Sequence, residues 1–198
     1  MAAASIAVPH HDLPPFAHYR GKVGMWCLIT AESAIFCIFV VAYLYYAGKS
    51  LSGPTPAQVL EVPIFGSICL FSSSLTIVLA EKALHAGNLR RFGLCWFLTI
   101  ALGVTFLVGT AREWYRLIYH DGLTIKTNLF GTTFYSLVGL HAFHVIVGVI
   151  GLTTIMLLTW MGAVKQEHSP RVNVFAMYWH FVDAIWVVVL SVVYFIAR

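Results

Sequence analysis

The chain has 198 residues, of which 60% are hydrophobic and 10% are charged, with a formal net charge of +4 and a mean hydropathy of +0.83. Soluble domains carry about 25% charged residues, so this composition excludes a soluble globular domain. The basic residues are dispersed among the loops, which excludes a nucleic-acid-binding surface. The apolar runs are too long and unbroken for an outer-membrane barrel, so we predict an all-α integral membrane protein.

Residues 1–21 are predicted to form an irregular N-terminal tail, because they contain several prolines and lack the basic and apolar regions of a signal peptide. Apolar runs bounded by charges and turn residues follow, and each is long enough to cross a membrane as a helix. The short loops between them predict one five-transmembrane-helix bundle over residues 22–198. The five predicted spans are about 23–47, 62–80, 92–117, 129–161 and 172–196.

The loop lysines and arginines favour an orientation with the N-terminus inside and the C-terminus outside, because cytoplasmic loops are enriched in these residues. In that orientation seven basic residues fall on the inner side and five on the outer side. The inner residues are Arg20, Lys22, Lys82, Arg90, Arg91, Lys165 and Arg171, and the outer ones are Lys49, Arg112, Arg116, Lys126 and Arg198.

Three of the predicted spans carry ionisable side chains near their middle. An ionisable residue inside a span costs at least about 2.5 kcal/mol, so it faces the bundle interior and usually has a partner. Glu32 lies about 15 Å past Lys22 along a helix, and the other groups fall at a similar depth. The sequence therefore predicts one buried polar layer, with a possible link to proton movement. Its members are Glu32, His141, His144, His180 and Asp183.

Several kinds of chemistry fit these residues. His141 and His144 lie three residues apart on one helix face, so they cannot bind opposite sides of one haem, although His180 could supply the second ligand. A copper or iron site would need three or more clustered ligands, and a buried carboxylate such as Glu32 can exchange protons. The alternative without a cofactor is hydrogen bonding between helices. His180 would then pair with Asp183, and the other histidines would meet Glu32 or Asp183. We favour this alternative and predict no metal ligand and no catalytic residue.

A second charged cluster, in "GTAREWYRLIYHDG", lies at the predicted outer end of the third span. Arg112, Glu113 and Arg116 fall within about one helical turn, beside the aromatic side chains typical of a membrane interface. We expect Glu113 to pair with Arg116, which would leave Arg112 for a lipid phosphate or a partner subunit.

Four segments together resemble subunit III of the haem-copper oxidases, in the order of that family and over roughly residues 22–198. The glutamate-bearing helix of the family is similar to "GMWCLITAESAIFCIFVVAYLYY", and its paired-histidine helix to "FYSLVGLHAFHVIVGVIGL". Its outer glutamate-aromatic segment resembles "GTAREWYRLIYHDG", and its closing helix resembles "YWHFVDAIWVVVLSVVYFI". Five helices correspond to the short bacterial form of this subunit.

The resemblance implies a non-redox core subunit of a proton-pumping terminal oxidase that reduces O2 to water, most simply a cytochrome c oxidase. The chain would take part in catalysis only within the complex, since haem and copper belong to subunits I and II. It would stabilise subunit I, hold phospholipids and support proton uptake in the bacterial plasma (inner) membrane. A respiratory supercomplex is left open as a further partner.

Three alternatives stay open at this point. A quinol oxidase subunit III has the same helices, because the electron donor is decided mainly by subunit II. An accessory subunit of a nitric-oxide reductase shares the architecture. A small b-type haem membrane anchor is the alternative from a different class of protein.

Overall fold

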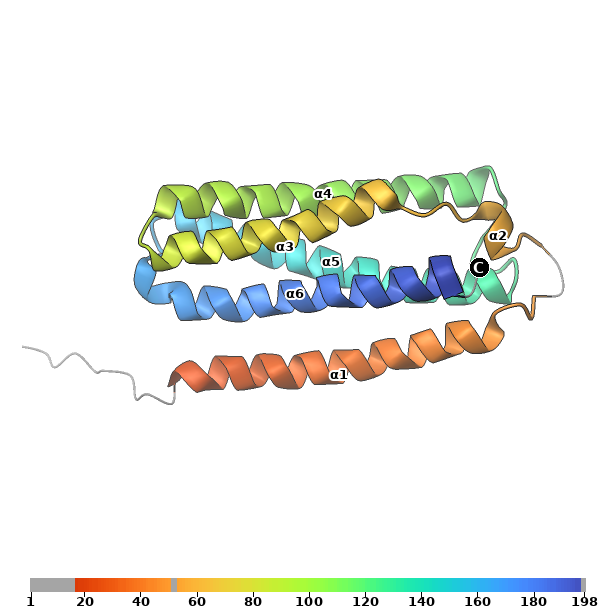
Figure 1. Cartoon of the computed structure of the whole chain (residues 1–198), viewed down its shortest axis with the longest axis horizontal. Coiled ribbons are helices and arrows are strands. Elements are labelled where there is room, and N and C mark those ends of the chain that lie inside the picture. Colours follow the sequence, from red (N-terminus) through yellow and green to blue (C-terminus); the bar gives the residue numbers. More distant parts are fainter. Residues whose placement is uncertain (1–16, 51–52, 197–198) are drawn as a thin grey trace, which may run out of the picture.

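The computed structural model describes residues 17–50 and 53–196, and these form an all-helical bundle. Five long helices run side by side along the longest axis, and successive ones point in opposite directions (Figure 1). All five are long and apolar enough to cross a membrane. They are α1 (Ala17–Tyr46), α3 (Ile64–His85), α4 (Leu89–Tyr119), α5 (Leu129–Trp160) and α6 (Ser169–Ser191), which continues as the π-helical turn η2 (Val192–Ile196).

The prediction of five membrane-spanning helices is therefore confirmed, with boundaries shifted by a few residues. Helix α1 starts at Ala17, so residues 17–21, predicted to belong to the irregular tail, are helical instead. The rest of that predicted tail lies outside the described residues. Two short helices were not predicted, α2 (Pro56–Val59) and the 3-10 turn η1 (Gln166–His168). The orientation of the bundle in the membrane stays a prediction.

Local sequence explains where the long helices begin and end. Asn88 and Asn128 precede α4 and α5, and their side chains accept backbone N–H groups of Arg91 (3.1 Å) and Gly131 (2.8 Å). Such caps satisfy N–H groups that have no partner within the helix. Helix α3 ends two residues before Gly87, whose φ of 71° suits a residue without a Cβ.

Helices α3, α4, α5 and α6 form the core, and the indole rings of α6 occupy its centre. Trp179 and Trp186 are at most 1% exposed, and their N–H groups donate to Ser73 (2.9 Å) and Ser67 (3.0 Å) of α3. A Cβ added at Gly148 of α5 would lie 2.7 Å from the Trp179 ring. The glycine therefore lets α5 and α6 approach closely, as small residues do between membrane helices.

Helix α1 lies at the edge of the bundle and packs on α5 and α6 (Figure 1). Of its most apolar stretch only 11% is buried, compared with 50% for the stretch that includes α6. The exposed side chains are largely apolar, for example Trp26, Ile38 and Val41. Such a face is suited to contact with lipid or with another membrane subunit, because exposure of a large apolar patch to water is unfavourable.

The four cysteines are free thiols, and they differ in burial. Cys69 lies in the core and Cys95 is half-buried, which suits the role of small apolar side chains. Cys27 and Cys37 are exposed on α1, although their apolar surroundings in the sequence would favour burial of all four cysteines. They belong to the same uncovered face of α1.

Candidate functional site

Glu32 of α1 and His144 of α5 form the polar contact that links the outlying helix to the core. The His144 Nε2 atom lies 3.2 Å from a Glu32 carboxylate oxygen. The other ring nitrogen, Nδ1, lies 2.8 Å from the carbonyl oxygen of Leu140. The Phe36 ring covers the imidazole at a centroid distance of 5.0 Å.

The Leu140 carbonyl determines which nitrogen of His144 carries a proton. A carbonyl oxygen only accepts, so Nδ1 carries a proton and donates it to Leu140. One further proton then lies between His144 Nε2 and the Glu32 carboxylate. It is held either by the acid, in a neutral pair, or by the imidazole, in an ion pair. This proton can therefore move between the two side chains while the hydrogen bond between them is kept. The Glu32 side chain is 27% exposed, so it is accessible from the α1 side of the bundle.

Ser74 of α3 links His180 and Asp183 of α6, which were predicted to contact each other directly. The Ser74 hydroxyl donates to the Asp183 carboxylate and lies 3.1 Å from His180 Nδ1. A hydroxyl has only one proton to donate, so His180 Nδ1 donates to the serine oxygen. The predicted pairing along α6 is thus replaced by a bridge between two helices. Sequence reasoning missed Ser74, although a run of three serines inside an apolar span was a visible signal.

His141 stands apart from both contacts. The residue is 1% exposed, and neither ring nitrogen has a hydrogen-bond partner among the described residues. Its ring stacks on Trp186 at a centroid distance of 4.9 Å and meets the edge of Phe106 at 5.8 Å. The expected single polar layer is therefore resolved into two hydrogen-bonded contacts and one imidazole packed among aromatic rings.

The charged cluster of α4 lies at the end of the bundle that carries α2, which we call the α2 end. Arg116 pairs with Glu61 at 2.5 Å and donates to the Val59 carbonyl at 3.0 Å, so the expected pairing with Glu113 is wrong. Glu113 instead accepts the Tyr194 hydroxyl at 3.0 Å. The geometric reason is that the segment before α3 brings Glu61 to Arg116, whereas the turn η2, which continues α6, brings Tyr194 to Glu113. Glu61 and Tyr194 are distant in sequence, which is why the pattern within α4 did not reveal them.

The residues that could hold a metal are dispersed. Within residues 17–50 and 53–196, no group of three or more His, Cys, Asp and Glu side chains has a geometry that could hold a metal ion. The nitrogens of His144 and the Nδ1 atom of His180 already have hydrogen-bond partners in the protein. The arrangement provides hydrogen bonds between helices. At Glu32 and His144 it also provides a proton that can move between the carboxylate and the imidazole.

Comparison with known proteins gives a consistent answer. The family described as "Cytochrome c oxidase subunit III" matches residues 18–198. Cytochrome c oxidase subunit 3 of Alkalihalophilus pseudofirmus is 31% identical, over 96% of this chain and 94% of its own length. The same subunit of Synechocystis is 35% identical, over 93% and 78%. Cytochrome bo(3) ubiquinol oxidase subunit 3 of Pseudomonas aeruginosa is 28% identical, over 86% and 82%.

The chain belongs to the cytochrome c oxidase subunit III family. It is thus a multi-pass membrane subunit of a haem-copper terminal oxidase, and it takes part in the respiratory chain together with other oxidase subunits. The predicted family is confirmed. The comparisons name relatives that differ in electron donor, and they give no support to a b-type haem anchor.

Proposed function

We propose that this chain is a non-redox subunit III of a proton-pumping oxidase that reduces O2 to water with cytochrome c as electron donor. It would lie in the bacterial plasma membrane with its N-terminus inside, as the seven-to-five distribution of loop lysines and arginines favours. Haem and copper would be held by subunits I and II. The observation that carries the proposal is the Glu32–His144 contact, in which two polar groups within the membrane-spanning helices are hydrogen-bonded to each other.

The exposed face of α1 supports a place beside subunit I. The face is apolar along a membrane-length helix, and it includes the partly exposed Glu32. We propose that subunit I and phospholipids held between the two subunits cover it in the complex. Glu32 would then stand at the boundary between the subunits. From there its exchangeable proton could support proton uptake by subunit I, while the bundle keeps that flank ordered during turnover.

The test is Glu32→Gln in the complete oxidase, with Glu167→Gln as the matched control, because Glu167 is exposed in the 3-10 turn η1 before α6. The amide keeps the shape of the side chain and removes the exchangeable proton. We expect an assembled oxidase whose turnover decays sooner, or whose protons pumped per electron are fewer, than in the control. Unchanged assembly, turnover and pumping would contradict the role of Glu32.

A quinol oxidase is the second candidate, because one relative is a ubiquinol oxidase subunit 3 at 28% identity. The donor is bound outside this chain, so the discriminating observation is made on the complex. Oxidation of reduced cytochrome c by the purified oxidase, together with a copper-binding cysteine and histidine set in subunit II, supports the first proposal. Oxidation of ubiquinol alone supports the second.

A further inference from the structure

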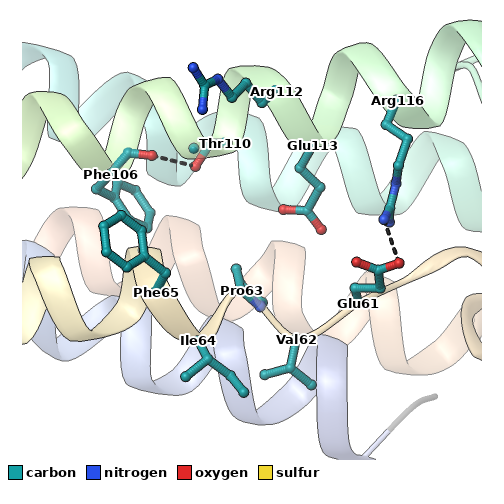
Figure 2. A pocket seen from close by; sticks show the side chains of 12 residues that line it. Glu61, Val62, Pro63, Ile64, Phe65, Phe106, Thr110, Arg112, Glu113 and Arg116 are labelled. Carbon is teal, nitrogen blue, oxygen red and sulfur yellow. Dashed lines mark hydrogen bonds and ion pairs between the residues drawn. The ribbon is translucent and has the colours of Figure 1, made fainter.

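A pocket of about 430 Å³ opens at the α2 end, between the start of α3 and the last turns of α4 (Figure 2). Its charged lining consists of Glu61, Arg112, Glu113 and Arg116. Phe65 and Phe106 also line the pocket and form an apolar wall. A pocket with charges on one side and aromatic rings on the other fits an amphipathic ligand.

The charged side chains that line the pocket differ in how many ion-pair and hydrogen-bond partners they have in the protein. Arg116 and Glu61 neutralise each other at 2.5 Å. Glu113 uses one carboxylate oxygen to accept the Tyr194 hydroxyl, and Figure 2 shows its carboxylate extending from α4 toward the segment before α3. Arg112 is exposed, and no residue in the described part of the chain forms an ion pair or hydrogen bond with its guanidinium. One cation and one carboxylate oxygen are thus available to a ligand.

These two groups lie at different places along the pocket. Figure 2 shows the Arg112 guanidinium beside α4 on the side of Thr110, whereas the Glu113 carboxylate points toward the segment before α3, nearer to Glu61. A ligand that satisfies both must carry a negative and a positive group in separate positions. A simple anion would leave Glu113 unsatisfied and would also face the carboxylate of Glu61.

The apolar wall continues into the region that faces lipid. The Phe65 ring is 71% exposed at the start of α3, whereas Phe106 behind it is buried. Gly66 lies against the Phe106 ring, since a Cβ added there would be 3.4 Å from it, and Gly109 borders open space along this wall. An exposed aromatic side chain on a membrane-spanning helix contacts acyl chains.

The depth of the pocket matches the headgroup region. Helix α4 has 31 residues and is therefore about 46 Å long, longer than the hydrocarbon core of about 30 Å. Each end then extends beyond the core by about 8 Å if the helix is centred. Arg112 lies about 10 Å from the end of α4 at Tyr119, which places it near the boundary between headgroups and acyl chains.

We propose that this pocket is a binding site for a zwitterionic phospholipid with an ethanolamine headgroup. The phosphate pairs with the Arg112 guanidinium, and the primary ammonium donates to the Glu113 carboxylate. One acyl chain lies along the wall of Phe65 and Phe106. Choline has no N–H group to donate to Glu113, and glycerol headgroups have no cation. The site therefore selects ethanolamine among lipids with the same chains. This inference does not depend on the electron donor or on the role of Glu32.

The test uses the complete detergent-purified oxidase, depleted of lipid and then supplied with phosphatidylethanolamine, phosphatidylcholine or phosphatidylglycerol with identical acyl chains. Native mass spectrometry counts the lipids retained per complex. We expect the intact oxidase to retain one more phosphatidylethanolamine than the Arg112→Gln variant. In Glu113→Gln the preference for ethanolamine over choline at this site should fall by about tenfold, the effect of losing a charge-assisted hydrogen bond.

Arg91→Gln is the matched control, because Arg91 is an exposed arginine on the same helix at the opposite end of the bundle. It should retain the same lipids as the unaltered oxidase. The comparison of headgroups in the unaltered oxidase needs no substitution, so the test stands even if a variant does not assemble. Equal retention of all three headgroups would overturn the proposal. So would displacement of the lipid by an equal concentration of water-soluble glycerophosphoethanolamine, since that outcome removes any role for the apolar wall.

Discussion

Two polar contacts inside the same bundle serve different kinds of interface. Ser74, His180 and Asp183 join α3 to α6 within the four-helix core, and Asp183 is only 5% exposed. Glu32 and His144 join α1 to α5 at the edge, and the Glu32 side chain is 27% exposed. The first contact holds together helices that already cover one another, whereas the second lies where another subunit can approach.

The difference in exposure between Asp183 and Glu32 predicts different effects of substitution, on folding for the first and on the working oxidase for the second. Asp183 is almost completely enclosed, so it can exchange protons only with its immediate neighbours and its main effect is on helix packing. Glu32 has the same kind of partner but also an accessible side. We therefore expect substitutions in the core to affect folding first, and substitutions at Glu32 to affect the working oxidase first.

The largest effect on folding is expected from Trp179→Ala in the core. The ring is fully buried against Gly148, and its N–H donates to Ser73, so its removal leaves a cavity and breaks a buried hydrogen bond between α6 and α3. We expect a loss of about 3–5 kcal/mol in the free energy of unfolding, measured by denaturant titration in detergent. Trp26→Ala, at an exposed site on α1, should change it by less than about 0.5 kcal/mol. Similar losses for both would contradict the division into core and edge.

Ser74→Ala should have an intermediate effect. The substitution leaves the buried Asp183 carboxylate and His180 Nδ1 without their shared partner, which destabilises the bundle by about 1–3 kcal/mol. The control is Ser191→Ala, because the Ser191 hydroxyl donates to the Val187 carbonyl within its own helix. If both substitutions reduce the free energy of unfolding equally, the serine does not bridge α3 and α6.

The smallest effect on stability is expected at the edge, for the contact between Glu32 and His144. Hydrogen bonds between membrane helices contribute about 0.6 kcal/mol on average and at most about 1.7 kcal/mol. A double-mutant cycle with Glu32→Ala and His144→Ala should therefore give a coupling energy of about 1 kcal/mol. Strictly additive effects would show that the two side chains do not stabilise each other.

The sequence was sufficient for the spans because each apolar run is bounded by charges or turn residues, as at Lys49 or at Gly87 and Asn88. It also placed Glu32 and His144 at a common depth, since depth follows from helical rise alone. It could not give the rotation of one helix against another. For that reason Ser74, Glu61 and Tyr194 were missed as partners, and His141 was grouped with side chains that it does not contact.

The central claim is that the membrane histidines of this chain act through packing and hydrogen bonds and not as ligands of a redox centre. The most direct test is the haem and copper content per assembled oxidase when His141→Phe, His144→Gln and His180→Gln are introduced one at a time. We expect the same haem and copper content as in the unaltered complex for all three variants. Loss of one haem or one copper per complex in any assembled variant would contradict it.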